Sequence, residues 1–144
     1  MDVGIDMHSE MDKLVIMDHY NYPHNKVDCC PDNYLEELGY NPSCGDKVYL
    51  YLKINDDQTI DIKWSGTGCS ICCASSSMAS EELNGLTKEE ALNKINQFEQ
   101  MITGHDINIE IFGEARALAG LNQFPSRFKC GFLSWGTIRE MLKK

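Results

Sequence analysis

Residues 47–64 read KVYLYLKINDDQTIDIKW, and apolar side chains alternate along both arms of this stretch, on either side of residues 55–58. A period of two is typical of a strand with one buried face, and the sequence NDDQ at 55–58 is typical of a turn. A connection this short joins antiparallel strands. The buried face of the predicted hairpin carries Val48, Leu50, Leu52, Ile54, Ile60, Ile62 and Trp64. A short third strand around Ser65–Cys69 is expected to extend the hairpin.

The sequence that follows residue 71 has helical character. Apolar positions predict helices over 74–83, 87–103 and 126–142. Thr87 followed three residues later by Glu90 is a capping-box pattern, which marks the start of the second of these helices. Residues 105–125 are expected to be irregular, with one short helix near 114–119.

The segment before the hairpin divides into a helix and a loop. Residues 9–19 predict an amphipathic helix, with Ser9 and Asp12 as a capping box. Residues 21–45 are rich in turn-forming types and have no period, so a long loop is expected there. One face of the helix would consist of Met7, Met11, Leu14, Val15 and Asp18 or His19. The whole chain, 1–144, is expected to form a single α+β domain, a small antiparallel three-stranded sheet packed against several helices.

Composition narrows the classes of function. A net charge of −9 argues against nucleic-acid binding, which requires clustered Lys and Arg. No stretch approaches the roughly 18 apolar residues of a membrane span, and the acidic N-terminus is unlike a signal peptide, so a cytoplasmic protein is expected. In that compartment seven cysteines indicate metal binding or redox chemistry rather than structural disulfides.

Three cysteines and one aspartate lie on separate glycine-bearing or helix-starting segments. Cys44 and Asp46 belong to NPSCGD, Cys69 to GTGCSI, and Cys130 to RFKC. Three thiols and a carboxylate suit a tetrahedral, borderline-soft metal such as zinc, and the site is expected at one end of the sheet. Cys69 and Cys130 each fall at a predicted helix start, where the helix dipole favours a thiolate.

Two other interpretations of the cysteines remain open. Cys69 and Cys72 form a C-x-x-C, which could work as a redox dithiol, although the βαβ context of such proteins is absent. Cys72 could also replace Asp46 as the fourth ligand of an all-sulfur site. Cys73 and the pair Cys29–Cys30 have no ligand-like spacing. None of the four histidines is assigned to the site.

Several blocks, taken together and in this order, resemble the NifU N-terminal/IscU family of iron–sulfur assembly scaffolds. They are IMDHY at 16–20, NPSCGD at 41–46, GTGCSI followed by ASSSM at 66–78, and KC at 129–130. Within that family the chain resembles the SufU branch. Lys129 stands where IscU proteins have a histidine, and residues 104–125 match an insertion before the last helix in place and length.

The resemblance implies a function and a site. Cys44, Asp46, Cys69 and Cys130 would bind zinc, and the protein would accept persulfide sulfur from a cysteine desulfurase of the SufS type, as a zinc-dependent sulfurtransferase. Cys44 would be the attacking thiol, because it was expected on a mobile loop. The resemblance also suggests a monomer. The alternative is a scaffold on which a labile [2Fe–2S] cluster is assembled and then transferred.

Overall fold

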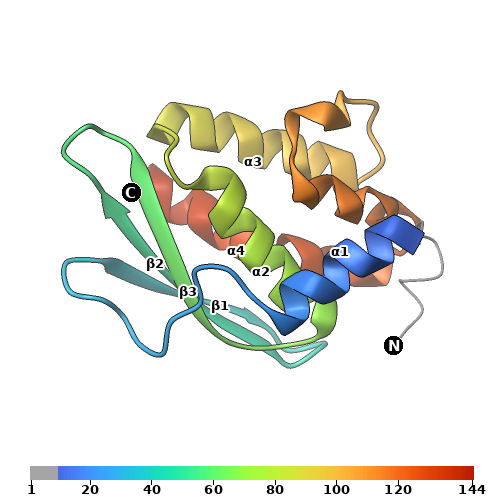
Figure 1. The fold of residues 1–144 in the computed structure, drawn as a ribbon, viewed down its shortest axis with the longest axis horizontal. Helices are drawn as coiled ribbons and strands as arrows, with labels where there is room; N and C mark the ends of the chain where they lie inside the picture. Colours follow the sequence, from blue (N-terminus) through green and yellow to red (C-terminus); the bar gives the residue numbers. More distant parts are fainter. Residues whose placement is uncertain (1–9) are drawn as a thin grey trace.

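The computed structural model describes residues 10–144, which form a three-stranded antiparallel sheet with helices packed against it (Figure 1). The helices and strands are α1 (Glu10–Asn21), β1 (Leu35–Asn41), β2 (Asp46–Ile54), β3 (Ile60–Thr67), α2 (Ser70–Leu83), α3 (Lys88–Ile102) and α4 (Phe128–Lys143). Short 3₁₀ segments between α3 and α4 are η2 (Ile109–Ile111), η3 (Glu114–Gln123) and η4 (Pro125–Arg127). The α+β class and the three-stranded sheet are confirmed.

The β2–β3 hairpin forms as predicted. Its two strands pair antiparallel with Leu50 opposite Trp64. Of the seven residues predicted on its inner face, six are buried and Ile54, at the end of β2, is exposed. Tyr51 on the other face is also buried, and its hydroxyl contacts the Ser65 hydroxyl at 2.6 Å.

The third strand is not where the sequence placed it. Residues 65–67 simply continue β3, and the third strand is β1, which lies inside the predicted loop over 21–45. β1 pairs antiparallel with β2, with Asn41 opposite Asp46 at the end of the ladder. A tight turn over residues 42–45 joins the two strands, so Cys44 lies on a turn rather than on a long loop.

Two layers of helices cover one face of the sheet. α2 and α4 contact the strands directly, while α1 packs against α2 and α3 packs against α4 (Figure 1). The Thr87–Glu90 capping box opens α3 as predicted. Among residues 10–144, no helix is both long enough and apolar enough to cross a bilayer.

The predicted face of the first helix is right for Val15 and His19, which pack against the core or are buried, and wrong for the other two described residues. Met11 and Leu14 are 67% and 65% exposed, whereas Ile16 and His19 are the buried residues of α1. Met7, and the capping box proposed with Ser9, lie outside the described residues. α1 therefore contacts α2 through a face that includes a buried histidine, a feature that periodicity of apolar residues does not reveal.

Candidate metal centre

The β1–β2 turn and the start of β2 supply Cys44 and Asp46. Gly45 has a φ of +70°, a conformation that glycine adopts without strain, and it lets the chain reverse between the two residues. The Cys44 backbone N–H donates to the Asn41 carbonyl oxygen at 3.3 Å. The Cys44 side chain is half-buried, whereas the Asp46 side chain is completely buried. The turn therefore presents a reachable thiol next to an enclosed carboxylate.

Asp46 connects two of the segments. Its Oδ1 accepts a hydrogen bond from the Cys69 backbone N–H at 2.9 Å, and its Oδ2 accepts one from the Asn41 side-chain amide at 3.2 Å. These donors offset part of the cost of burying a carboxylate. A Cβ added to Gly68 would lie 2.6 Å from Asp46 Oδ1, so this close approach requires glycine.

Cys69 is the N-cap residue of α2. Its sulfur accepts from the Cys72 backbone N–H at 3.4 Å, a contact that favours the thiolate. The pKa of Cys69 is lowered to about 7, first by a hydrogen bond from the Cys130 thiol and then by the backbone N–H groups of the helix start, against the effect of burial. The helix start acts in the expected direction, but the hydrogen bond from Cys130 lowers the pKa of Cys69 more.

Cys130 lies in the first turn of α4, as predicted, but it does not become the thiolate. Its side chain is buried, and its sulfur is 3.0 Å from the Cys44 sulfur and 3.6 Å from the Asn41 amide nitrogen. The pKa of Cys130 is raised, because its thiol donates to the Cys69 sulfur and because it is buried. Of this hydrogen-bonded pair, the Cys69 sulfur is thus the one whose thiolate is favoured.

The four predicted ligand residues come together at the end of the sheet where β2 begins. One ligand atom from each of Cys44, Asp46 and Cys130 falls within a span of 4.8 Å. The Cys69 sulfur lies outside this group of three, but its thiol is hydrogen-bonded to Cys130 and its backbone N–H to Asp46. Sulfurs around a tetrahedral zinc with bonds of about 2.3 Å lie about 3.8 Å apart. The Cys44 and Cys130 sulfurs, at 3.0 Å, would need only a small separation, so the donor set fits zinc.

The remaining cysteines lie apart from this cluster or inside the core. Cys72 is fully buried in α2, and burial raises its pKa, which disfavours the thiolate that a metal ligand or a redox dithiol requires. Cys73 is also buried, and burial raises its pKa too. Cys29 is exposed and Cys30 half-buried, in the segment that precedes β1.

Asn41, which directly precedes the Cys44 turn, is also a residue of the site. Its buried amide donates to Asp46 and lies next to the Cys130 sulfur, so it fixes the carboxylate between two cysteine segments. The signal in the sequence was its position directly before the Cys44 turn, which alone does not distinguish a ligand-orienting amide from an ordinary turn residue.

Comparison with known proteins gives the family of the chain. The profile of the NifU-like N terminal domain matches residues 11–131. The chain belongs to this family. Two curated relatives match this NifU-like domain over most of its length.

One relative is the zinc-dependent sulfurtransferase SufU of Bacillus subtilis, 38% identical over 92% of this chain and 89% of its own. Another is the iron–sulfur cluster assembly scaffold protein IscU of Streptococcus pyogenes, 38% identical over 90% of this chain and 81% of its own. Among solved structures, FiSufU of Fervidobacterium islandicum AW-1, a protein of the SUF system, superposes with a TM-score of 0.79. It is 32% identical, and the match covers 95% of this NifU-like domain and 97% of FiSufU.

Proposed function

We propose that the protein accepts persulfide sulfur from a cysteine desulfurase for iron–sulfur cluster assembly, with zinc held by Cys44, Asp46, Cys69 and Cys130. The observation that carries this proposal is the convergence of Cys44, buried Asp46 and Cys130 at the end of the sheet, with the Cys69 thiol hydrogen-bonded to Cys130. The similarity to a zinc-dependent sulfurtransferase supports the choice of zinc and of the reaction. The relatives of the SUF system support a SufS-type desulfurase as the partner.

Zinc, when bound, holds its cysteine ligands as thiolates. The chain's own residues prepare two of the four ligands before any metal arrives. The Cys69 backbone N–H and the Asn41 amide hold the Asp46 carboxylate, and the start of α2 stabilises the Cys69 thiolate. Cys130 is enclosed at the start of α4, so it serves best as a fixed ligand.

Cys44 is the proposed acceptor because it is reachable. It is half-buried on a turn, and a Cβ added to its neighbour Gly45 would meet no atom within 4 Å, so one side of the turn is open to a partner. Because Cys44 lies on a tight turn, loop mobility does not explain its role as acceptor. Its accessibility does. Cys69 is also half-buried, but its sulfur caps α2, which restrains it.

The transfer step needs no external oxidant or reductant. The Cys44 thiolate attacks the outer sulfur of the desulfurase persulfide, and a new sulfur–sulfur bond forms on Cys44. The bond between the two desulfurase sulfurs breaks, and the desulfurase cysteine leaves as a thiolate. Cys44 then carries a persulfide, which is the form in which sulfur is passed on.

The experiment that tests this proposal follows sulfur onto the protein. We expect wild type, incubated with a SufS-type desulfurase and free cysteine, to gain one sulfur atom by mass spectrometry and to accelerate the desulfurase. Cys44→Ala should lose both effects while keeping its far-UV circular dichroism. Cys29→Ala, which removes an exposed thiol elsewhere, is the matched control and should behave as wild type. Normal sulfur uptake by Cys44→Ala would overturn the assignment.

A second candidate function is a scaffold for a labile [2Fe–2S] cluster, favoured by the similarity to the Streptococcus pyogenes scaffold protein. The same three thiols and carboxylate would be its ligands, since thiolates also hold iron–sulfur clusters. Iron and acid-labile sulfide in protein purified without oxygen would support this function. Zinc alone would support sulfur transfer.

Three further features belong to the same proposal. We infer that residues 104–125 are an insertion within a single domain, 1–144, because η3 packs against α1, α2, α3 and α4 rather than forming a separate unit. We also propose that the protein works as a monomer in the cytoplasm.

A further inference from the structure

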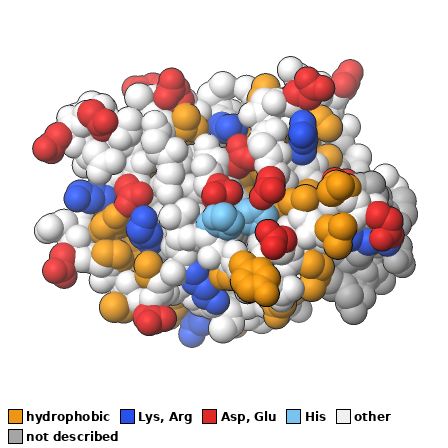
Figure 2. All heavy atoms as spheres, in the orientation of Figure 1, with side chains coloured by type: hydrophobic (Ala, Val, Ile, Leu, Met, Phe, Trp, Pro, Cys, Tyr) orange, Lys and Arg blue, Asp and Glu red, His pale blue; other side chains and the backbone are white. Residues whose placement is uncertain are grey.

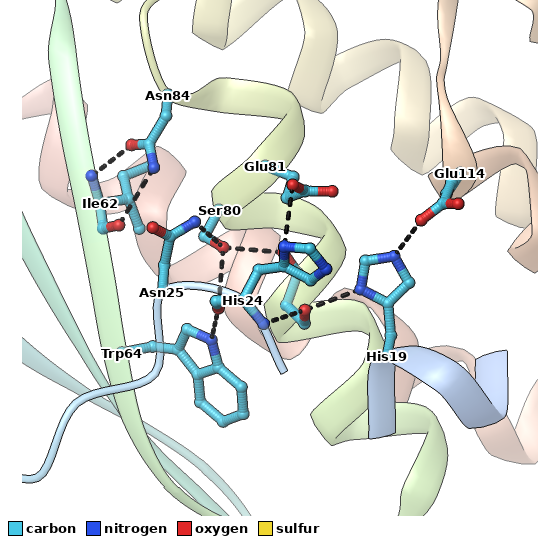
Figure 3. A network of polar contacts seen from close by, with 10 residues as sticks. His19, His24, Asn25, Ile62, Trp64, Ser80, Glu81, Asn84 and Glu114 are labelled. Atoms are coloured by element: carbon cyan, nitrogen blue, oxygen red, sulfur yellow. Dashed lines mark hydrogen bonds and ion pairs between the residues drawn. The ribbon is translucent and has the colours of Figure 1, made fainter. Parts of the chain in front are cut away.

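A second group of metal-binding side chains lies away from the cysteines. His19 near the end of α1, His24 just beyond α1, and Glu81 near the end of α2 each place one ligand atom within 4.8 Å of the others. The two imidazole rings are 5.0 Å apart between centroids. On the face shown in Figure 2, histidine side chains lie at the centre with acidic side chains around them. Figure 3 shows the residues that hold this group together.

His19 is buried, and both nitrogens of its imidazole ring have hydrogen-bond partners. Its Nε2 lies 2.6 Å from a carboxylate oxygen of Glu114, and its Nδ1 lies 2.7 Å from the Ser77 hydroxyl. A carboxylate can only accept, so Nε2 carries the proton, and in the neutral ring Nδ1 has the free lone pair. A carboxylate holding one ring nitrogen while the other faces a metal is the usual arrangement of metal-binding histidines.

The backbone around His24 is fixed as well. The His24 N–H donates to the Ser77 hydroxyl at 2.8 Å, and the His24 carbonyl oxygen accepts from the Trp64 indole at 2.9 Å (Figure 3). Its side chain remains 43% exposed and lies 3.0 Å, through Nδ1, from a carboxylate oxygen of Glu81, itself 42% exposed. One ligand is thus rigid, while the other two are anchored at the backbone and have room to adjust their side chains.

We propose that His19, His24 and Glu81 form a second metal site, for an exchangeable divalent transition-metal ion such as zinc. Two imidazoles and one carboxylate are a donor set that zinc accepts with a water in the fourth position. The cation enters from the exposed side of His24 and Glu81, and Nδ1 of His19 releases the Ser77 hydroxyl to bind it. Glu114 keeps its hydrogen bond to Nε2 and positions the ring.

This site is independent of the cysteine site. Cys69 caps the start of α2 and Glu81 lies near its end, twelve residues further on, which is about 18 Å along the helix axis at 1.5 Å per residue. Metal bound there would join the end of α1 and its following loop to α2, while the proposed sulfur chemistry takes place at the other end of the helix. The inference therefore stands whether or not the proposed function is correct.

The competing explanation is an ordinary ion pair between His24 and Glu81 with a structural His19 beside it. Partly exposed ion pairs contribute little to stability and have no selectivity for transition metals. A metal site would instead discriminate strongly between zinc and magnesium, because imidazole is a poor ligand for magnesium. Selectivity and dependence on all three side chains separate the two explanations.

The test is calorimetric titration of zinc into the protein as purified, whose metal content is measured first. We expect wild type to bind one further equivalent of zinc that excess magnesium does not displace. His24→Ala and Glu81→Gln, both at exposed positions where folding is preserved, should weaken this binding at least about tenfold. Glu114→Gln should also weaken it about tenfold, because losing a partner that orients a ligand costs about 10–100-fold in metal affinity. His105→Ala removes an exposed histidine outside the group and should bind as wild type does.

A spectroscopic measurement then identifies the atoms. Zinc should shift the imidazole NMR signals of His19 and His24 and leave those of His105 unchanged, with His19 Nε2 remaining protonated. The proposal is overturned if wild type binds no further equivalent, or if His24→Ala and Glu81→Gln bind it as tightly as wild type. It is also overturned if magnesium displaces the zinc.

Discussion

Gly68 lies so close to the Asp46 carboxylate that a side chain at position 68 would collide with it. The Asp46 carboxylate accepts the backbone N–H of Cys69, the residue directly after Gly68, and this contact sets the carboxylate beside the cysteine sulfurs. Because Asp46 is buried, it has no room to retreat without losing its hydrogen bonds. The position of Asp46, the proposed oxygen ligand, therefore depends on the absence of a side chain at Gly68.

Gly68→Ala should weaken zinc binding at least about tenfold, since an alanine Cβ would lie 2.6 Å from Asp46 Oδ1 and must push the carboxylate aside. Competition with a coloured zinc chelator measures the affinity, and circular dichroism checks the fold. Gly113→Ala is a matched control, because its Cβ would also meet a carboxylate oxygen, that of Glu82 at 3.1 Å. Gly113 lies at the start of η3 and belongs to none of the cysteine segments. Equal zinc affinity in both variants and wild type would show that Asp46 is not a ligand.

At the scale of single residues, the sequence indicated the candidate ligands more readily than the residues that hold those ligands in place. Cys44, Asp46, Cys69 and Cys130 were predicted as ligands because zinc accepts few residue types and because each lies at a turn, a strand start or a helix start. Asn41 and Gly68 support the ligands through contacts between segments far apart in the chain, and no local pattern encodes such contacts. The same holds for His19, whose partners Ser77 and Glu114 are 58 and 95 residues away.

β1 is the element that the sequence did not predict, and its burial pattern explains why. The inner face of β1 carries Glu37, Gly39 and Asn41, and its one apolar side chain, Leu35, is exposed at the end of the strand. Leu38 and Tyr40 point outward and are also exposed. Period-two alternation of apolar residues is then misleading. Pairing with β2 and close packing of Gly39 against α4 form the strand instead.

Gly39→Ala should destabilise the protein by about 1–3 kcal/mol, as overpacking does. The added Cβ would lie 2.6 Å from the Thr137 hydroxyl oxygen in α4, which is held by a 2.8 Å hydrogen bond to the Leu133 carbonyl oxygen. Urea unfolding of Gly39→Ala, Thr137→Ala and the double variant measures the effect. Because the second change removes the obstructing hydroxyl, we expect the double variant to recover much of the loss, and strictly additive effects would contradict this packing argument.

At the scale of the whole molecule, the cysteine site joins the β1–β2 turn, the start of α2 and the start of α4. The hydrophobic core between the sheet and the helices reaches this site through Cys130, and it includes both tryptophans, Trp64 and Trp135. A core of this extent should fold without metal, unlike that of a small zinc finger. Metal should therefore add to stability by mass action rather than create the fold.

Removing the metal should lower the melting temperature and leave the fold intact. A ligand present at about 1,000 times its Kd contributes about 4 kcal/mol, which for a chain of this size corresponds to a fall on the order of 10 °C when a chelator is added. Scanning calorimetry with and without EDTA measures the shift, and far-UV circular dichroism reports the fold. His24→Ala, which disables the proposed second site, should show a shift close to that of wild type, whereas Asp46→Ala should show a much smaller one. Unfolding of wild type at room temperature after chelation would mean that the core does not suffice, and an unchanged melting temperature would mean that the three segments are not joined by metal.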